Sequence, residues 1–227
     1  MTTLVLLRHG LTAMTGPVLA GWTPEVHLDE RGRAQAAAVA ERLREVPFAA
    51  VVSSPLERCV ETATAVAGER PVTLEDRLGE CRYGDWTGRP LKELAKDPLW
   101  KVVQQHPSAA TFPGGEALRD TQHRAVAAVR DWNAQLGPDA LWLACSHGDV
   151  IKAVVADALG MHLDQFQRLQ VDPCSVTVIR YTETRPFVVR LNDTGGGTAD
   201  LLPPPKGKRR TRPSSDAAVG GGAGTGA

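Results

Sequence analysis

The sequence of 227 residues predicts an α/β fold: a three-layer sandwich with a mostly parallel central sheet, helices on both faces and a small helical lid insertion. Two short, continuously apolar runs, 3–7 and 141–145, each lead into a His-Gly pair. Runs of this kind are typical of buried parallel strands. Segments with helical character separate the strand-like runs, and this alternation indicates strand–helix–strand units. The length suits one domain with a sizeable core.

The first half of the chain contains three expected strands and two helices. After the run at 3–7 and a loop, a helix is predicted over 29–45 with Asp29 as its N-cap. A second strand is expected over 48–53, and Pro55 opens a helix that runs to about residue 67. A short third strand follows over 72–74.

The second half begins with an irregular stretch. Residues 77–113 have few strand signals, a tight turn at Tyr83-Gly84-Asp85 and short helical pieces, so we interpret them as an inserted lid. A long helix is expected over 116–136, followed by the apolar run at 141–145 and a helix over 149–159. The sheet is expected to close with strands over 175–180 and 187–191, which form an antiparallel edge.

The last part of the chain has a different composition. From Gly195 onward it holds glycine runs, three consecutive prolines and a basic cluster over 206–212. Ordering a backbone costs about 1–2 kcal/mol per residue, and this segment has almost nothing apolar to bury. We therefore expect a folded domain over 1–194 and a disordered tail over 195–227. The basic cluster is compatible with a nucleic-acid or membrane contact, but a solvated tail is the favoured interpretation.

Composition restricts the partners and the compartment. The chain has 26 basic and 26 acidic side chains, which gives no reason to expect a nucleic-acid partner. Its four cysteines include no Cys-x-x-Cys pair, so reduced thiols are expected. No apolar stretch approaches 18 residues, and the N-terminus does not resemble a signal peptide. We expect a cytoplasmic protein without membrane contact, and a homodimer is left open.

Histidines and arginines follow the expected strands. Ligands of open α/β sheets bind beyond the carboxyl ends of the strands, so His9 and His147 share a pocket if their strands are neighbours. A neutral imidazole is a competent nucleophile near pH 7. Arg8 lies beside His9, and Arg58 lies in the first turn after the second strand. A guanidinium group matches two phosphate oxygens, and phosphoryl transfer needs positive donors around the phosphorus.

Glycines and a helix start support the same interpretation. Gly10 and Gly148 allow close approach of the backbone to a ligand. The helix after His147 offers its N–H groups to an anion. Thr12, Gly21 and Trp22 lie in the loop after His9 and are candidates for substrate contact, although Trp22 fits a core position equally well.

Four motifs, taken together and in this order, resemble the histidine phosphatase superfamily, in its phosphoglycerate-mutase-like branch. They are Leu-Leu-Arg-His-Gly (6–10), Ser-Ser-Pro-Leu-Glu-Arg-Cys-Val-Glu-Thr-Ala (53–63), Leu-Gly-Glu-Cys-Arg-Tyr-Gly-Asp-Trp-Thr-Gly (78–88) and Ser-His-Gly-Asp-Val-Ile (146–151). The resemblance implies a phosphohistidine intermediate on His9, a phosphoryl group held by Arg8, Arg58 and His147, and Glu80 as general acid and base. It implies no metal and no organic cofactor. The expected substrate-binding set is Arg8, Gly10, Thr12, Gly21, Arg58, His147 and Gly148.

Glu80 needs a special environment for this role. A free glutamate is ionised at pH 7, and raising its pKa by two to three units requires about 3–4 kcal/mol. Partial burial and a neighbouring phosphate both act in that direction. Tyr83 and Trp86 from the expected lid are candidates for the dry surroundings.

The segment between the expected acid and the second histidine bears on the reaction. The bisphosphoglycerate-dependent mutases carry a longer segment there with additional basic residues and a Glu-Arg-x-Tyr-Gly motif, whereas this chain has Glu-Cys-Arg-Tyr-Gly. Its main cations in this segment are Lys92, Lys96, Lys101 and Arg119. We therefore expect a phosphomonoester hydrolase that acts on a small phosphorylated metabolite, with a phosphomutase as the alternative and a weakly active scaffold, binding through the basic tail, as a third interpretation. The tail is expected to be dispensable for catalysis.

Overall fold

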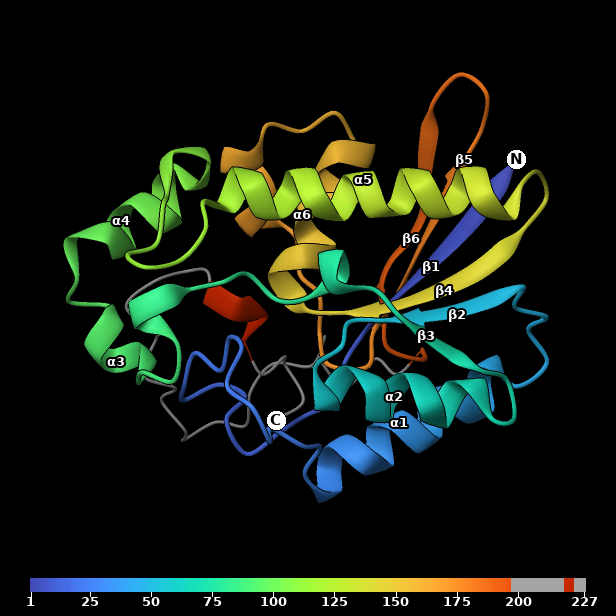
Figure 1. Cartoon of the computed structure of the whole chain (residues 1–227), viewed down its shortest axis with the longest axis horizontal. Helices are drawn as coiled ribbons and strands as arrows, with labels where there is room; N and C mark the ends of the chain where they lie inside the picture. The colour runs from blue at the N-terminus through green and yellow to red at the C-terminus, as the bar shows by residue number, and fades with distance from the viewer. Residues whose placement is uncertain (197–218, 223–227) are drawn as a thin grey trace, which may run out of the picture.

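The structure is a computed structural model and describes residues 1–196 and 219–222. Among these residues, six strands form one sheet in the order β3-β2-β4-β1-β5-β6 (Figure 1). The strands are β1 (Thr2–Arg8), β2 (Ala50–Ser53), β3 (Val72–Leu74), β4 (Leu141–Ser146), β5 (Val176–Tyr181) and β6 (Pro186–Asp193). The first four are parallel, and β5 and β6 add an antiparallel edge.

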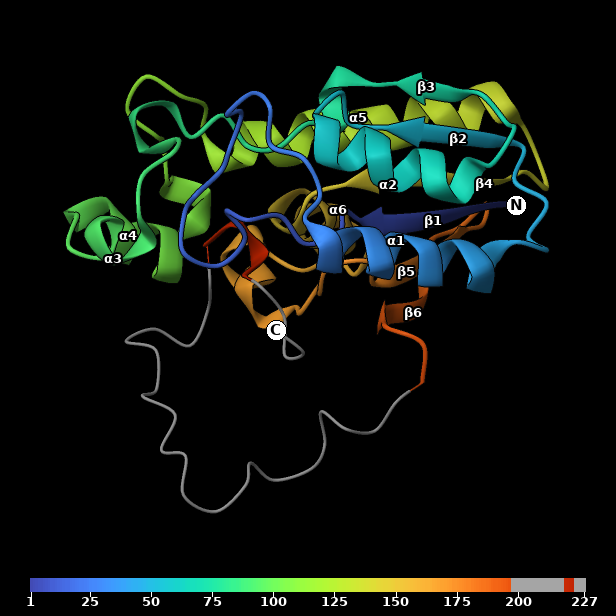
Figure 2. The same cartoon turned by 90° about the horizontal axis from the view of Figure 1, so that it is seen from below.

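Helices cover both faces of this sheet. On one face lie α1 (Glu30–Leu43) and α2 (Glu57–Ala67), and on the other lie α5 (Leu118–Leu136) and α6 (Gly148–Ala158) (Figures 1 and 2). Each face has its own apolar core: Val5 and Leu7 of β1 point to the α1–α2 side, and Leu4 and Leu6 to the α5–α6 side. This two-sided burial explains why β1 is continuously apolar. The predicted fold class is confirmed.

The helix boundaries follow from local capping. Asp29 accepts a hydrogen bond from the backbone N–H of Gly32 at 2.8 Å, so α1 begins at Glu30 as its N-cap predicts. The helix that Pro55 was expected to open begins two residues later, at Glu57. Leu56 is still extended there, with φ −72° and ψ 137°. This difference leaves Arg58 in the first turn of α2.

The stretch predicted as an inserted lid contains only short helices. They are α3 (Leu91–Leu94), α4 (Pro98–Gln105) and the 3₁₀ turns η1 (Asp76–Leu78), η2 (Gly84–Trp86) and η3 (Pro107–Ala109); a further turn, η4 (Leu163–Arg168), follows α6. Tyr83 and Trp86 are fully buried and pack against Phe112 with ring centroids 5.0 and 5.3 Å apart. The insertion therefore has an aromatic core of its own beside α6.

The pairing of β1 with β4 sets the position of the site. Leu7 is paired with Cys145 and Arg8 with Ser146, so His9 and His147 emerge at the same level of the sheet. The backbone N–H of His9 donates to the carbonyl oxygen of Ser146 at 3.1 Å. The prediction that the two apolar strands are neighbours is confirmed.

The C-terminal segment, residues 219–222, packs on the folded domain. Val219 is 2% exposed, and the turn η6 (Val219–Gly221) lies beside the loop that follows β1 (Figure 2, red and blue). The prediction of a disordered tail is therefore wrong for these four residues, because one apolar side chain and several backbone hydrogen bonds offset the cost of ordering them. Residues 197–218, with the basic cluster, and 223–227 lie outside the described residues.

Two further observations concern the cysteines and the length of the helices. All four cysteines are buried free thiols, as the sequence predicts. Within the described ranges, every helix is too short or too polar to cross a membrane.

Candidate active site

His9 follows the end of β1 and presents a neutral imidazole. Its Nδ1 lies 2.7 Å from the carbonyl oxygen of Gly10, which can only accept, so Nδ1 carries the proton and Nε2 keeps a free lone pair. The pKa of His9 is held well below 6.5, first by burial and then by the positive charges of Arg58 and Arg8. The ring is thus deprotonated at Nε2 at neutral pH, the state that a nucleophile requires.

His147 follows β4 and is also neutral. Arg58 donates from Nη2 to Nδ1 of His147 at 3.3 Å, so Nδ1 accepts. The proton of the ring is therefore on Nε2, which donates to the hydroxyl of Ser54 at 2.8 Å. The imidazole rings of His147 and His9 have centroids 5.2 Å apart. Burial is the main cause that lowers the pKa of His147, and Arg58 adds to it.

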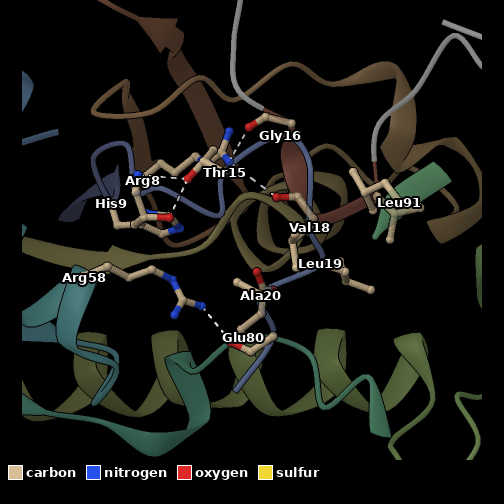
Figure 3. A pocket seen from close by; sticks show the side chains of 15 residues that line it. Arg8, His9, Thr15, Gly16, Val18, Leu19, Ala20, Arg58, Glu80 and Leu91 are labelled. Atoms are coloured by element: carbon tan, nitrogen blue, oxygen red, sulfur yellow. Dashed lines mark hydrogen bonds between the residues drawn. The ribbon is translucent and has the colours of Figure 1, made fainter. Parts of the chain in front are cut away.

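Two buried arginines face the same space (Figure 3). Arg8 and Arg58 are each 1% exposed. Arg58 also donates to the carbonyl oxygen of Gly21 at 2.8 Å, and Arg8 to that of Val171 at 2.7 Å. Within the described part of the chain, Nε of Arg8 and Nη1 of Arg58 are buried without an acceptor. Buried guanidinium donors without acceptors fit an anionic ligand such as a phosphoryl group.

Glu80 brings a carboxyl group close to His147 and into the same pocket as His9. Its Oε2 is 3.8 Å from Nδ1 of His147, and its Oε1 accepts from the backbone N–H of Cys81 at 3.0 Å. Burial, and next the negative charge of Asp149, raise the pKa of Glu80 to about 7. A carboxyl group with this pKa can both give and take a proton near neutral pH. Tyr83 and Trp86 lie in the adjacent aromatic core, as expected.

The loop after His9 forms the opposite wall of the pocket. Thr12 and Gly21 both line it. The same loop adds Thr15, Gly16 and residues 18–20 (Figure 3). Gly21 has φ +52°, a conformation that favours glycine and that aims its carbonyl oxygen at Arg58. Trp22 donates from Nε1 to the backbone carbonyl of Glu80 at 2.6 Å, so it supports the Glu80 loop.

The two glycines after the histidines do not line this pocket. A Cβ on Gly10 would lie 2.7 Å from the carbonyl oxygen of Gly32, so the glycine is required by the close approach of α1. Gly148 begins α6 and is covered by Gly221, to whose Cα a Cβ would come within 2.8 Å. Both glycines therefore serve close packing of the backbone in this structure, and the N–H of Gly10 donates to the hydroxyl of Thr62 at 3.1 Å.

Residues 4–194 match the family model of the histidine phosphatase superfamily (branch 1). The chain belongs to this superfamily. Its members transfer phosphoryl groups, and this histidine phosphatase is accordingly an enzyme of phosphoryl transfer.

Related proteins include both phosphatases and mutases. A glucosyl-3-phosphoglycerate phosphatase from Mycolicibacterium vanbaalenii is 33% identical over 174 residues, which cover 72% of this chain and 76% of the relative. A 2,3-bisphosphoglycerate-dependent phosphoglycerate mutase 2 from Gloeobacter violaceus is 30% identical over 77% of this chain and 83% of its own. The crystal structure of a phosphoserine phosphatase from Entamoeba histolytica, in complex with 3-phosphoglyceric acid, superimposes with a TM-score of 0.78 and 26% identity, covering 85% of this chain and 98% of that one.

Four functional features of this histidine phosphatase had no signal in the sequence or were given no role. Ser54 and Asp149 stand inside the quoted motifs but were not assigned. Arg124 is one arginine in a long helix, yet it donates to the carbonyl oxygens of Arg77, Gly79 and Glu80 at 2.7–2.9 Å. The fourth feature is the C-terminal segment, which contacts Arg8.

Proposed function

We propose that this enzyme is a phosphomonoester hydrolase that acts through a phosphohistidine intermediate on His9. The observation that carries the proposal is the hydrogen bond between Nδ1 of His9 and Gly10, which leaves the lone pair of Nε2 free beside two buried arginines. The catalytic set is His9, Glu80, His147, Arg8 and Arg58.

In the first step, Nε2 of His9 attacks phosphorus and the bond from phosphorus to the leaving oxygen breaks. Glu80 supplies the proton that this oxygen needs, so an alcohol leaves. Its pKa of about 7 keeps a large protonated fraction available at neutral pH. Arg8 and Arg58 stabilise the charge on the equatorial oxygens.

In the second step, water attacks the phosphorus and the P–N bond breaks. Glu80 is now a carboxylate and accepts the proton of the water. Inorganic phosphate leaves, and His9 returns to its neutral form. His147 holds its proton on Nε2 toward Ser54 and its Nδ1 toward Arg58, so it fixes the arginine beside the transferred group.

The charges around the pocket favour hydrolysis over a phosphomutase reaction that passes through a bisphosphate. Its lining includes two cationic side chains, Arg8 and Arg58, and both are needed for the reacting phosphoryl group. The cations noted in the sequence between Glu80 and His147 (Lys92, Lys96, Lys101 and Arg119) are exposed and do not line the pocket. Among the residues that the structure describes, a second phosphate would therefore meet no additional positive charge in the pocket.

The substrate class follows from the same features. A buried site with two guanidinium groups and a carboxyl group fits a small phosphate monoester. The names of the relatives, a glucosyl-3-phosphoglycerate phosphatase and a phosphoserine phosphatase, support small phosphorylated metabolites as the class to test.

The test combines phosphate release with trapping of the intermediate. A panel of sugar phosphates, phosphoglycerates, phosphoserine, nucleotides and phosphorylated cofactor precursors is assayed for inorganic phosphate, and interconversion of phosphoglycerates is assayed in parallel. We expect release from at least one small monoester and an acid-labile phosphate on His9 after rapid quenching. His9→Ala should remove both signals, whereas His123→Ala, at an exposed histidine of α5, should remove neither. An acid-stable phosphate, or phosphoglycerate interconversion faster than phosphate release, would overturn the proposal.

A further inference from the structure

The C-terminal segment occupies the donors of Arg8 that face the pocket. The guanidinium Nη1 donates to the carbonyl oxygen of Gly221 at 2.8 Å, and Nη2 donates to those of Gly222 at 2.6 Å and Gly220 at 3.4 Å. With the bond from Nη1 to Val171, both terminal nitrogens of Arg8 are engaged. A phosphoryl group that binds to these nitrogens must displace the segment.

The segment is also held at its first two residues. Val219 is 2% exposed and packs in the aromatic core that includes Leu19 and Trp86. The backbone N–H of Gly220 donates to Oδ2 of Asp149 at 2.8 Å, an oxygen that also accepts from the hydroxyl of Tyr83. The segment therefore makes an apolar contact, a bond to a buried carboxylate and three bonds to a buried guanidinium group.

The local sequence is suited to this conformation. Gly220, Gly221 and Gly222 have φ of +77°, +81° and +61°, a run of left-handed residues that only glycine adopts at low cost. This run turns all three carbonyl oxygens toward one guanidinium group. A Cβ on Gly221 would lie 2.9 Å from Cα of Gly148 and 3.2 Å from Cζ of Arg8. Val-Gly-Gly-Gly thus combines one apolar side chain with three residues whose φ values favour glycine, and at Gly221 a larger residue would not fit.

The segment leaves little room for a substrate. Val219, Gly220 and Gly222 line the pocket, and the space open to the centres of water molecules is about 30 Å³. This is close to the share of one water molecule in the liquid, far below the few hundred Å³ of an ordinary ligand site.

We propose that residues 219–222 are an intramolecular competitive inhibitor of the active site. Their carbonyl oxygens take the place of phosphate oxygens on Arg8, and the substrate gains access by displacing them. This proposal rests on the proposed function, because it needs Arg8 to bind the phosphoryl group. A dianionic phosphoryl group adds the attraction of opposite charges and a bidentate geometry that neutral carbonyl oxygens do not offer to the Arg8 guanidinium group, so a bound substrate replaces the segment. Since the inhibitor is part of the same chain, inhibition does not depend on protein concentration.

The sharpest test compares two truncated chains. One ends at Gly222 and keeps the segment; the other ends at Ala218 and lacks it. Both lack residues 223–227, so they differ only in the four residues of the segment. We expect the shorter chain to have a KM and a dissociation constant for inorganic phosphate lower by about 3- to 30-fold, with kcat unchanged. Gly221→Val in the full chain should reproduce this change, because its side chain cannot fit between Arg8 and Gly148.

The readouts separate this inference from the proposed function. Phosphate binding is measured by calorimetry and needs no turnover, so a chain that hydrolyses none of the monoesters still tests the inference. Melting curves of all variants confirm that each is folded. Equal phosphate affinities in the two truncated chains would overturn the proposal that residues 219–222 inhibit the site. A higher KM in the chain that ends at Ala218 would overturn it as well, because the segment would then help to bind substrate.

Discussion

Arg124 donates from Nη2 to the backbone carbonyl oxygen of Glu80 at 2.9 Å and so connects the long helix α5 to the candidate acid–base residue. The same guanidinium group binds the carbonyl oxygens of Arg77 and Gly79 and forms an ion pair with Glu116. Arg124 is therefore a positioning residue: it fixes the loop from which the Glu80 side chain enters the site.

Replacing Arg124 by lysine should weaken catalysis through Glu80. A lysine has one nitrogen and cannot bind three carbonyl oxygens in one plane, so the loop loosens and water reaches the carboxyl group. We expect kcat to fall by about 10- to 100-fold and the alkaline limb of the pH–rate profile to move to lower pH as the pKa of Glu80 falls. Arg130→Lys, on the exposed side of the same helix, is the control. A fall in kcat without any movement of the pH profile would contradict this role.

Glu80→Gln should abolish turnover and raise stability at alkaline pH. The folded pKa of Glu80 is about 7, above its ordinary value of 4.5, so the folded protein binds this proton more tightly than the unfolded chain. The resulting stability is fully present below pH 4.5 and is lost as the pH rises toward 7. Since glutamine has no such loss, the variant should be more stable than the wild type above pH 7 by up to about 3 kcal/mol.

The measurement for this prediction is a pair of urea titrations at pH 4.5 and pH 8. The difference in free energy of unfolding between Glu80→Gln and the wild type should be small at pH 4.5 and large at pH 8. Glu57→Gln, in the first turn of α2, serves as the comparison. A difference that does not change with pH would show that the Glu80 carboxyl group is not buried as an acid.

Ser54→Ala should disturb the tautomer of His147. Without the hydroxyl, the Nε2–H of His147 loses its oxygen acceptor and keeps only the weak acceptor Sγ of Cys59 at 3.4 Å, and a poorly satisfied buried donor costs about 1 kcal/mol or more. The tautomer with the proton on Nδ1 then becomes more favourable, and this proton repels the guanidinium group of Arg58. We expect about a tenfold loss of kcat/KM, which Ser54→Thr restores because it keeps the hydroxyl. Nitrogen chemical shifts of the His147 ring report the tautomer directly, and an unchanged tautomer with unchanged activity would refute the assignment.

Activity should not depend on divalent metal ions, because Arg8 and Arg58 already supply positive charge at the phosphoryl group. Each charge-assisted hydrogen bond contributes about 1.5–3 kcal/mol, so Arg58→Ala should lower the rate by about one to two decades. Incubation with EDTA followed by a standard assay is the measurement. Loss of activity in EDTA that Mg²⁺ or Zn²⁺ restores would disprove this expectation.

The sequence predicted the parts of the molecule whose signals are local or periodic. Continuous apolar runs identified β1 and β4, and the capping of Asp29 placed the start of α1. The convergence of His9, His147, Arg8 and Arg58 followed from where they stand after strands, since parallel strands end at one edge. The sequence did not show that the cations between Glu80 and His147 (Lys92, Lys96, Lys101 and Arg119) are exposed, because burial of a polar side chain depends on the tertiary structure.

What the sequence could not predict are contacts across long separations. Arg124 reaches Glu80 from another element 44 positions along the chain, and Asp149 raises the pKa of a carboxyl group 69 positions before it. The glycine-rich C-terminal segment was expected to be disordered on composition. Composition counts apolar residues but does not register that a run of glycines can place three carbonyl oxygens around one buried arginine.

Because β1 and β4 pair in a fixed register, the relative position of His9 and His147 depends on the length of these two strands. Each imidazole follows its strand after a fixed number of paired residues, and successive side chains of a strand point to opposite faces. Deleting one residue from either strand would turn one histidine away from the other, although every catalytic residue would still be present. Connections elsewhere can grow at a modest entropic cost of about 0.6 kcal/mol per doubling of loop length. The insertion can therefore change in length while the two strands keep His9 and His147 opposite each other.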